Sequence, residues 1–137
     1  IHRRGGPAIL AECKRIRAER YPEGLPTGHA VATTGGELPA RWVIHTVGPI
    51  YAKREDRSDL LASCHLESLR LADELGARTV AFPAISTGVY GYPLDEAAPV
   101  SIEAVRAAET GVDEVRFVLF DRAAYEAFDR AMREAER

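Results

Sequence analysis

The chain has 137 residues, of which 46% are hydrophobic and 28% charged, and its formal net charge is −3. This length and composition are typical of one globular domain with its own core, and they exclude a disordered chain. The sequence has no apolar run of about 18 residues, so no membrane partner is expected. The acidic balance gives no long-range attraction to nucleic acid.

The spacing of cysteines and histidines argues against a metal site and against disulfides. Cys13 and Cys64 fall in helical patterns and form no CxxC pair. The four histidines are scattered: His2, His29, His45 and His65. We therefore expect two reduced thiols, a cytoplasmic protein and no metal ion.

The first half predicts one helix and one hairpin. Apolar residues recur at helical spacing from residue 8 to 21, in a segment rich in arginine. This basic segment is either a solvated helix face or a surface that attracts phosphates. Two strands, His29–Thr34 and Arg41–Val47, are joined through Gly35-Gly36. His45 alternates with its neighbours in the second strand, which favours a hydrogen-bonded strand histidine over a catalytic base.

The second half alternates helices and strands. The pattern predicts a helix from an N-capping Ser58 to Gly76, a strand over Thr79–Ile85, a helix over residues 94–109, a strand over Glu114–Phe120 and a last helix over residues 122–136. The apolar strand at Thr79 suits burial on both faces, as in a parallel sheet. In such sheets ligands bind outside the carboxyl ends of the strands. The segments after Ile85 and around Phe120 should therefore share one binding edge.

A glycine-bearing loop follows the buried strand, with the sequence Ser86-Thr87-Gly88-Val89-Tyr90-Gly91. Backbone N–H groups in such a loop can turn toward an anion, and glycine lets a phosphate approach the main chain closely. The alternative is an ordinary strand–helix turn. Asp95 and Glu96 favour that alternative, because they already complement the dipole of the next helix.

Three segments carry a family resemblance. The stretch Ala81–Pro93 resembles the second phosphate-binding loop of macrodomains, the ADP-ribose-binding modules, and looks most like that of the MacroD-type hydrolases. A second match to the family lies upstream of this loop, in Pro26–Thr34 followed by Leu38–Pro49. A third is Ile1-His2-Arg3 with Gly6-Pro7, which is similar to the end of the family's first glycine-rich loop and its following helix. The resemblance implies an α/β fold: a three-layer α/β/α macrodomain with a mixed central sheet, in which residues 1–137 form the C-terminal three-quarters of a single domain.

The resemblance also implies a function. A MacroD-type domain would bind ADP-ribose and hydrolyse ADP-ribosyl esters, on protein carboxylates or in O-acetyl-ADP-ribose, without a metal or other cofactor. The partner would be ADP-ribose or an ADP-ribosylated protein, and the chain a monomer. Two alternatives stay open: a reader that binds ADP-ribose without cleaving it, and a hydrolase that removes ADP-ribose from DNA. Nucleic acid would then enter only as a modified substrate.

By the same resemblance, individual residues receive expected roles. The diphosphate would lie against the amides of Thr87, Gly88, Val89 and Tyr90, in a loop that Ser86 supports. Gly91, like Gly88, would let a phosphate approach the main chain closely. Tyr90 would pack beside the distal ribose. Phe120 would lie against the adenine, and Asp121, the next residue, would belong to the same binding site. The alternative for Phe120 is a core position at the strand end. His2 matches a histidine below the proximal ribose and is the one catalytic candidate, or else it simply faces solvent.

The resemblance begins part-way into the family's domain. In the family, the Asp that orders the attacking water and the acidic residue that reads adenine precede the segment matching Ile1. One upstream strand lies between the strands resembling Arg41–Val47 and Thr79–Ile85. Without that strand, we expect the visible strands to form two separated pairs. We also expect residues upstream, or from another chain, to fill the gap.

Overall fold

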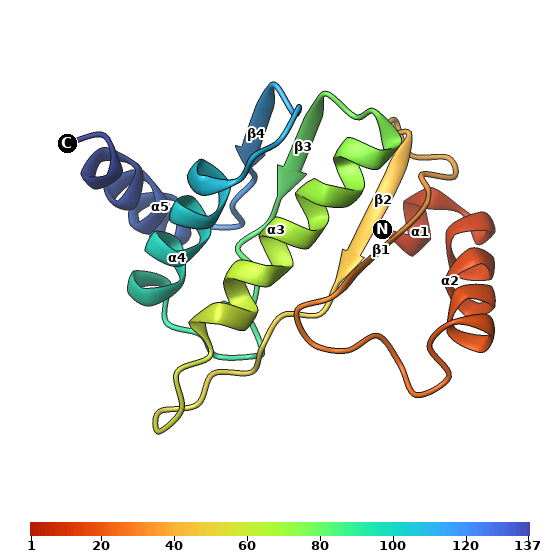
Figure 1. Ribbon diagram of the computed structural model, residues 1–137, viewed down its shortest axis with the longest axis horizontal. Coiled ribbons are helices and arrows are strands. Elements are labelled where there is room, and N and C mark those ends of the chain that lie inside the picture. The colour runs from red at the N-terminus through yellow and green to blue at the C-terminus, as the bar shows by residue number, and fades with distance from the viewer.

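The computed structural model describes residues 1–137 (Figure 1). Its elements are α1 (His2–Gly5), α2 (Pro7–Glu19), β1 (Ala30–Thr34), β2 (Trp42–Thr46), α3 (Ser58–Leu75), β3 (Thr79–Phe82), α4 (Leu94–Ala107), β4 (Glu114–Phe117) and α5 (Arg122–Ala135). The predicted order of helices and strands is confirmed. None of the helices is both long and apolar enough to cross a membrane.

The first half is a hairpin with a helix against it. Strands β1 and β2 are antiparallel, with Ala32 opposite Ile44, which confirms the predicted hairpin. Helix α2 begins at Pro7, which suits a first-turn position because proline lacks the N–H that would stay unpaired there. Ile9 on this helix is fully buried. The helix is therefore fixed to the hairpin by one apolar anchor and by polar contacts described below.

The second half contains two parallel strands and three packed helices. Strands β3 and β4 are parallel, with Val80 opposite Val115. Phe82 of β3 belongs to one core cluster with Leu61 and Cys64 of α3. Helices α4 and α5 form a second cluster, against which Phe117 of β4 packs. The two clusters meet at the aromatic rings of Phe82 and Phe117, whose centroids are 5.9 Å apart.

The strands form two separate sheets, β1–β2 and β3–β4, with no hydrogen-bonded pairing between β2 and β3. The expected separation into two pairs is therefore confirmed. Figure 1 shows β2, β3 and β4 running in the same direction, with α3 lying across the space between β2 and β3. Helix α3 contacts β1 and β2, and its core residues also pack on Phe82 of β3. One long helix thus holds the two sheets in a common arrangement.

Four local predictions are wrong. Strand β3 ends at Phe82 and β4 at Phe117, three residues before the predicted ends, because the chain turns into loops at Pro83 and after Phe117. Ser58 is not the N-cap of α3; the Asp56 carboxylate accepts its amide at 2.9 Å instead. Strand β3 is not buried on both faces. Thr79 and Ala81 are exposed, since nothing covers that side of the strand.

Candidate functional site

The loop after β3 is an exposed arch between two buried anchors. Ile85 and Tyr92 are almost fully buried, whereas Gly88 to Gly91 lie on the surface. Tyr92 N donates to Ser86 O at 2.9 Å, which closes the base of the arch. Ser86 has φ 68° and is the one non-glycine residue in the left-handed region. Side chains disfavour this conformation, so its presence marks a loop whose shape is set by its surroundings.

The crown of the arch presents unpaired backbone donors. The amides of Gly88, Val89 and Tyr90 make no hydrogen bond within the chain, whereas Thr87 N donates to Ala84 O at 3.3 Å. A Cβ added at Gly88 would meet no atom within 4 Å, so the space above the crown is open. Three successive free N–H groups with open space beside them are suited to an anion such as a phosphate. Of the four predicted amides, three are therefore free and one is used in the turn.

Two residues that sequence reasoning did not single out hold the arch in place. Gly48, just after β2, packs so closely on it that an added Cβ would lie 2.3 Å from Ser86 Oγ and 2.6 Å from Ile85 Cγ2. Tyr51 N donates to Tyr90 O at 2.9 Å. The Tyr51 ring also meets Tyr92 edge to face, with centroids 5.1 Å apart. The sequence feature that could have pointed to this contact is the Gly-Pro pair that follows β2. The arch that Gly48 contacts lies almost 40 residues further along the chain, so only the fold brings the two together.

Tyr51 is itself fixed from the other side. Its hydroxyl donates to Glu96 at 3.1 Å, and this hydrogen bond is the main cause of its raised pKa. Glu96 lies in the first turn of α4, where its charge also complements the helix dipole. The arch is thus tied to the chain before α3 and, through Tyr51, to the helix that follows it.

The end of β4 lies at the same edge as the arch, because β3 and β4 are parallel neighbours. Phe120 is fully exposed there, which excludes the alternative that it is a core residue. Asp121 has a structural role, since its Oδ1 accepts the amide of Ala124 at 2.9 Å and caps α5. The structure therefore leaves Phe120 free as a flat apolar surface, while the Asp121 side chain is engaged in capping.

A cavity of about 350 Å³ lies between the arch and the chain that follows β2. Its wall includes Gly48, Tyr90 and Arg57. Arg57 donates to Ile50 O at 2.8 Å and pairs with Glu55 at 2.9 Å. The site therefore combines free amides, an aromatic side chain at Tyr90 and a hollow lined in part by a guanidinium group.

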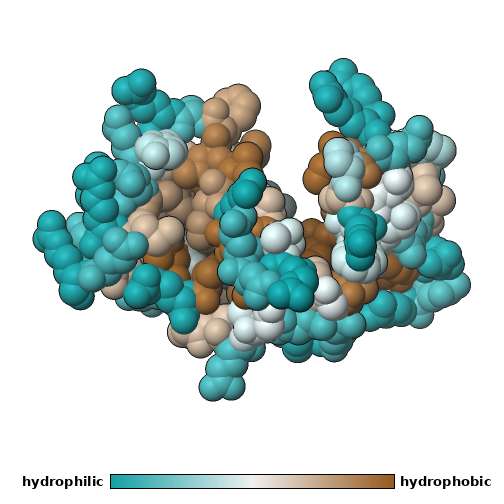
Figure 2. Space-filling model, turned by 90° about the horizontal axis from the view of Figure 1, so that it is seen from above, coloured by the Kyte–Doolittle hydropathy of each residue, from teal (hydrophilic) through white to brown (hydrophobic).

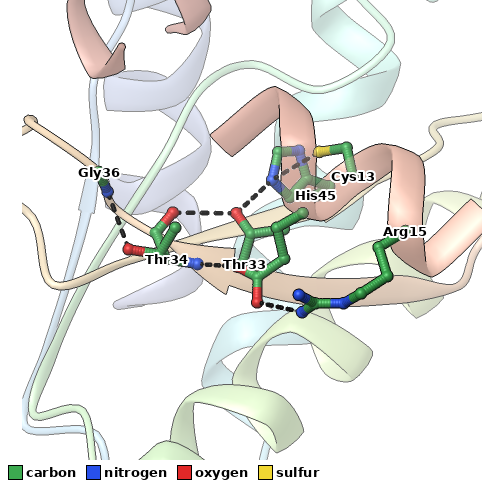
Figure 3. A network of polar contacts seen from close by, with 7 residues as sticks. Cys13, Arg15, Thr33, Thr34, Gly36 and His45 are labelled. Carbon is green, nitrogen blue, oxygen red and sulfur yellow. Dashed lines mark hydrogen bonds and ion pairs between the residues drawn. The ribbon is translucent and has the colours of Figure 1, made fainter. Parts of the chain in front are cut away.

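His2 lies outside this group. It is exposed on the short helix α1. Burial is the main cause of the lowered pKa of His45, and the nearby His2 is a smaller one. Figure 3 shows His45 inside a polar network between α2 and the hairpin. His45 Nε2 lies 2.9 Å from Thr33 Oγ1 and 3.7 Å from Cys13 Sγ. The prediction of a hydrogen-bonded strand histidine is confirmed, whereas the catalytic role of His2 stays a prediction.

Both thiols are free, and burial raises the pKa of each. The structure contains no group of three or more histidine, cysteine or carboxylate side chains that could hold a metal ion. The free amides of the arch can bind an anion, and the exposed aromatic side chains can bind flat or sugar-like groups.

Comparison with known proteins agrees with this geometry. The family model described as "Macro domain" matches residues 1–101. A macro domain-containing protein of Streptomyces nogalater is 69% identical over 98% of this chain and 75% of its own. The O-acetyl-ADP-ribose deacetylase of Escherichia fergusonii is 43% identical over 96% of this chain and 76% of its own.

A solved structure of the Oceanobacillus iheyensis macrodomain with ADP superimposes with a TM-score of 0.94 at 37% identity, covering 99% of this chain and 74% of that one. A mutant of the same macrodomain has been solved with ADPR, with a TM-score of 0.92. The chain thus spans about three-quarters of the length of these relatives. From the family match, the relatives and the fold together, the chain belongs to the macrodomain family.

Proposed function

We propose that this chain binds ADP-ribose at the edge formed by the arch and Phe120. The observation that carries the proposal is the crown of the arch, where the amides of Gly88, Val89 and Tyr90 are free and face open space. The diphosphate would accept these N–H groups. Phe120, fully exposed at the same edge, would stack on the adenine, and Tyr90 would pack beside the distal ribose. Relatives solved with ADP and with ADPR support this choice of ligand.

We further propose that the domain hydrolyses ADP-ribosyl esters, on modified protein carboxylates or in O-acetyl-ADP-ribose. The support is a relative that carries the name O-acetyl-ADP-ribose deacetylase. The arch would hold the diphosphate and thereby fix the distal ribose, so that the contribution of residues 1–137 is binding and orientation. The same amides would also stabilise the negative charge of the diphosphate that lies beside the reacting ester.

A reader that binds ADP-ribose without cleaving it is the second candidate. One observation favours it for residues 1–137: the carboxylates near the arch are already engaged. Asp121 caps α5 and Glu96 accepts the Tyr51 hydroxyl. By the family resemblance, the Asp that positions the attacking water precedes the segment matching Ile1. We therefore expect residues 1–137 alone to bind ADP-ribose and not to cleave it.

Calorimetry with ADP-ribose tests the binding site. We expect Gly88→Glu to abolish binding, because it puts a carboxylate where the diphosphate should lie. Gly88 is not in the left-handed region and has open space around it, so the variant should stay folded. Gly88→Gln has nearly the same size without the charge, and it should retain weak binding. Equal affinity of wild type and Gly88→Glu would show that the anion site is elsewhere.

A further inference from the structure

Two hollows adjoin the arch. The larger, of about 1100 Å³, is the gap between the two sheets, and Figure 2 shows it as a hollow between two lobes with apolar walls. A strand from upstream is already expected to fill it. The smaller, of about 350 Å³, lies between the arch and the chain after β2 and is here called the side cavity. The two share only Gly48 and Tyr90, so the side cavity is a separate hollow.

The lip of the side cavity is apolar although it faces solvent. Ile50 is 57% exposed, Tyr90 41% and Leu60 37%, and all three residues line the cavity. They come from three separate segments: the chain after β2, the arch and the first turn of α3. Large apolar side chains that gather around a hollow at a protein surface mark an interaction site. The side cavity is therefore suited to an apolar group of a partner.

The charges around the side cavity are balanced. Its charged lining residues are Glu55 and Arg57, whose carboxylate and guanidinium groups are 2.9 Å apart. Arg57 also donates to Ile50 O at 2.8 Å, so its side chain is fixed in the wall. Residues 53–56 contain two cations and two anions, so the loop before Arg57 is neutral as well. Proteins bind nucleic acid largely by neutralising its phosphates, and this balanced surface does not favour such a partner.

A main-chain donor is free at the same wall. The Ile50 amide makes no hydrogen bond within the chain, whereas the Ile50 carbonyl accepts Arg57. A bound polypeptide presents both an apolar side chain and a main-chain carbonyl that can accept such an N–H group. The side cavity therefore combines the two kinds of contact that an extended polypeptide makes.

We propose that the side cavity receives the polypeptide that carries the ADP-ribosyl group, with an apolar side chain next to the modified carboxylate held inside the lip. The inference rests on the function proposed above, in which the distal ribose packs beside Tyr90. The acceptor of an ADP-ribosyl ester is attached to that ribose, and Tyr90 is a wall of the side cavity. The acceptor therefore leaves the ribose next to Ile50 and Leu60. An acetyl group would leave most of the cavity empty, and the balanced charge favours a protein acceptor over DNA.

Calorimetry with free ADP-ribose and three ADP-ribosylated probes tests this assignment. Two probes are short peptides that carry ADP-ribose through an amide on the central side chain, which avoids ester cleavage. One has leucine on both sides of the modified residue, and the other has glycine there. The third is a short DNA strand with a terminal ADP-ribosyl group. We expect the leucine peptide to bind about tenfold more tightly than free ADP-ribose, because a leucine becomes buried. The glycine peptide and the DNA strand should bind no more tightly than free ADP-ribose.

A matched pair of leucine variants on α3 locates the peptide. Leu60→Ser should remove the advantage of the leucine peptide and leave the affinity for free ADP-ribose unchanged. Leu66→Ser is the control, since Leu66 is 41% exposed on the same helix but lies outside the side cavity. Both side chains are at the surface, so both variants should fold. Equal affinity of the two peptides, tighter binding of the DNA strand than of the leucine peptide, or the same result for both variants would overturn this assignment while ADP-ribose binding stood. Absence of ADP-ribose binding by the wild-type chain would overturn the proposed function together with it.

Discussion

Gly48→Ala tests whether the contact between β2 and the arch positions the binding loop. The added Cβ would lie 2.3 Å from Ser86 Oγ and 2.6 Å from Ile85 Cγ2, so the arch must move away from the strand. Overpacking of this kind costs about 1–3 kcal/mol. Unfolding entropy of about 2.1 cal/mol/K per residue gives about 0.3 kcal/mol per kelvin for this chain, so Tm should fall by about 3–10 °C.

The same displacement should weaken ADP-ribose binding at least tenfold, because Ser86 and Ile85 form the base from which the free amides project. Differential scanning fluorimetry measures the first effect and calorimetry the second. Gly111→Ala is the matched control: its Cβ would lie 3.6 Å from Asp73 Oδ1, an ordinary contact, far from the arch along the sheet. If Gly48→Ala kept both wild-type Tm and wild-type affinity, β2 would have no part in positioning the arch.

Three further outcomes are expected. Phe120→Ala should weaken ADP-ribose by about 1–3 kcal/mol but leave ribose-5-phosphate nearly unaffected, since only ADP-ribose has a base to stack; equal losses by calorimetry would contradict the stacking role. Burial lowers the pKa of His65, so the unfolded chain takes up a proton at about pH 6.5 while the folded chain does so only at lower pH. Stability should therefore fall as pH drops from 7 to 5, and His65→Leu should flatten this slope in urea titrations; an unchanged slope would exclude His65 as its source. Residues 1–137 should release no free ADP-ribose from a glutamate-modified protein, whereas a full-length relative should; turnover by the short chain would remove the need for an upstream Asp.

Local chemistry determined much of the fold. Apolar spacing and the glycines at helix ends predicted every helix and strand after α1, because periodicity follows from which side chains must be buried. The loop with Gly88 and Gly91 was identified from its glycines, because an anion-binding turn needs small residues and free amides. Helix capping was harder to predict: Asp56, two residues earlier, captures the Ser58 amide, a choice between neighbouring acceptors that spacing does not decide.

Only the tertiary structure decided what holds the arch and what lies beside it. Gly48 and Tyr51 contact the arch across more than 35 residues of chain, and no local pattern marks a pair that meets through a shared sheet edge. The exposure of Phe120 likewise depends on where β4 stops, because strand ends are set by the loss of a pairing partner and not by composition. The open edges of β2 and β3 were expected from the family resemblance, but no local pattern in the chain predicted them. Strand pairing is a contact between distant segments, so an apolar run predicts that a strand will be buried but not which neighbour buries it.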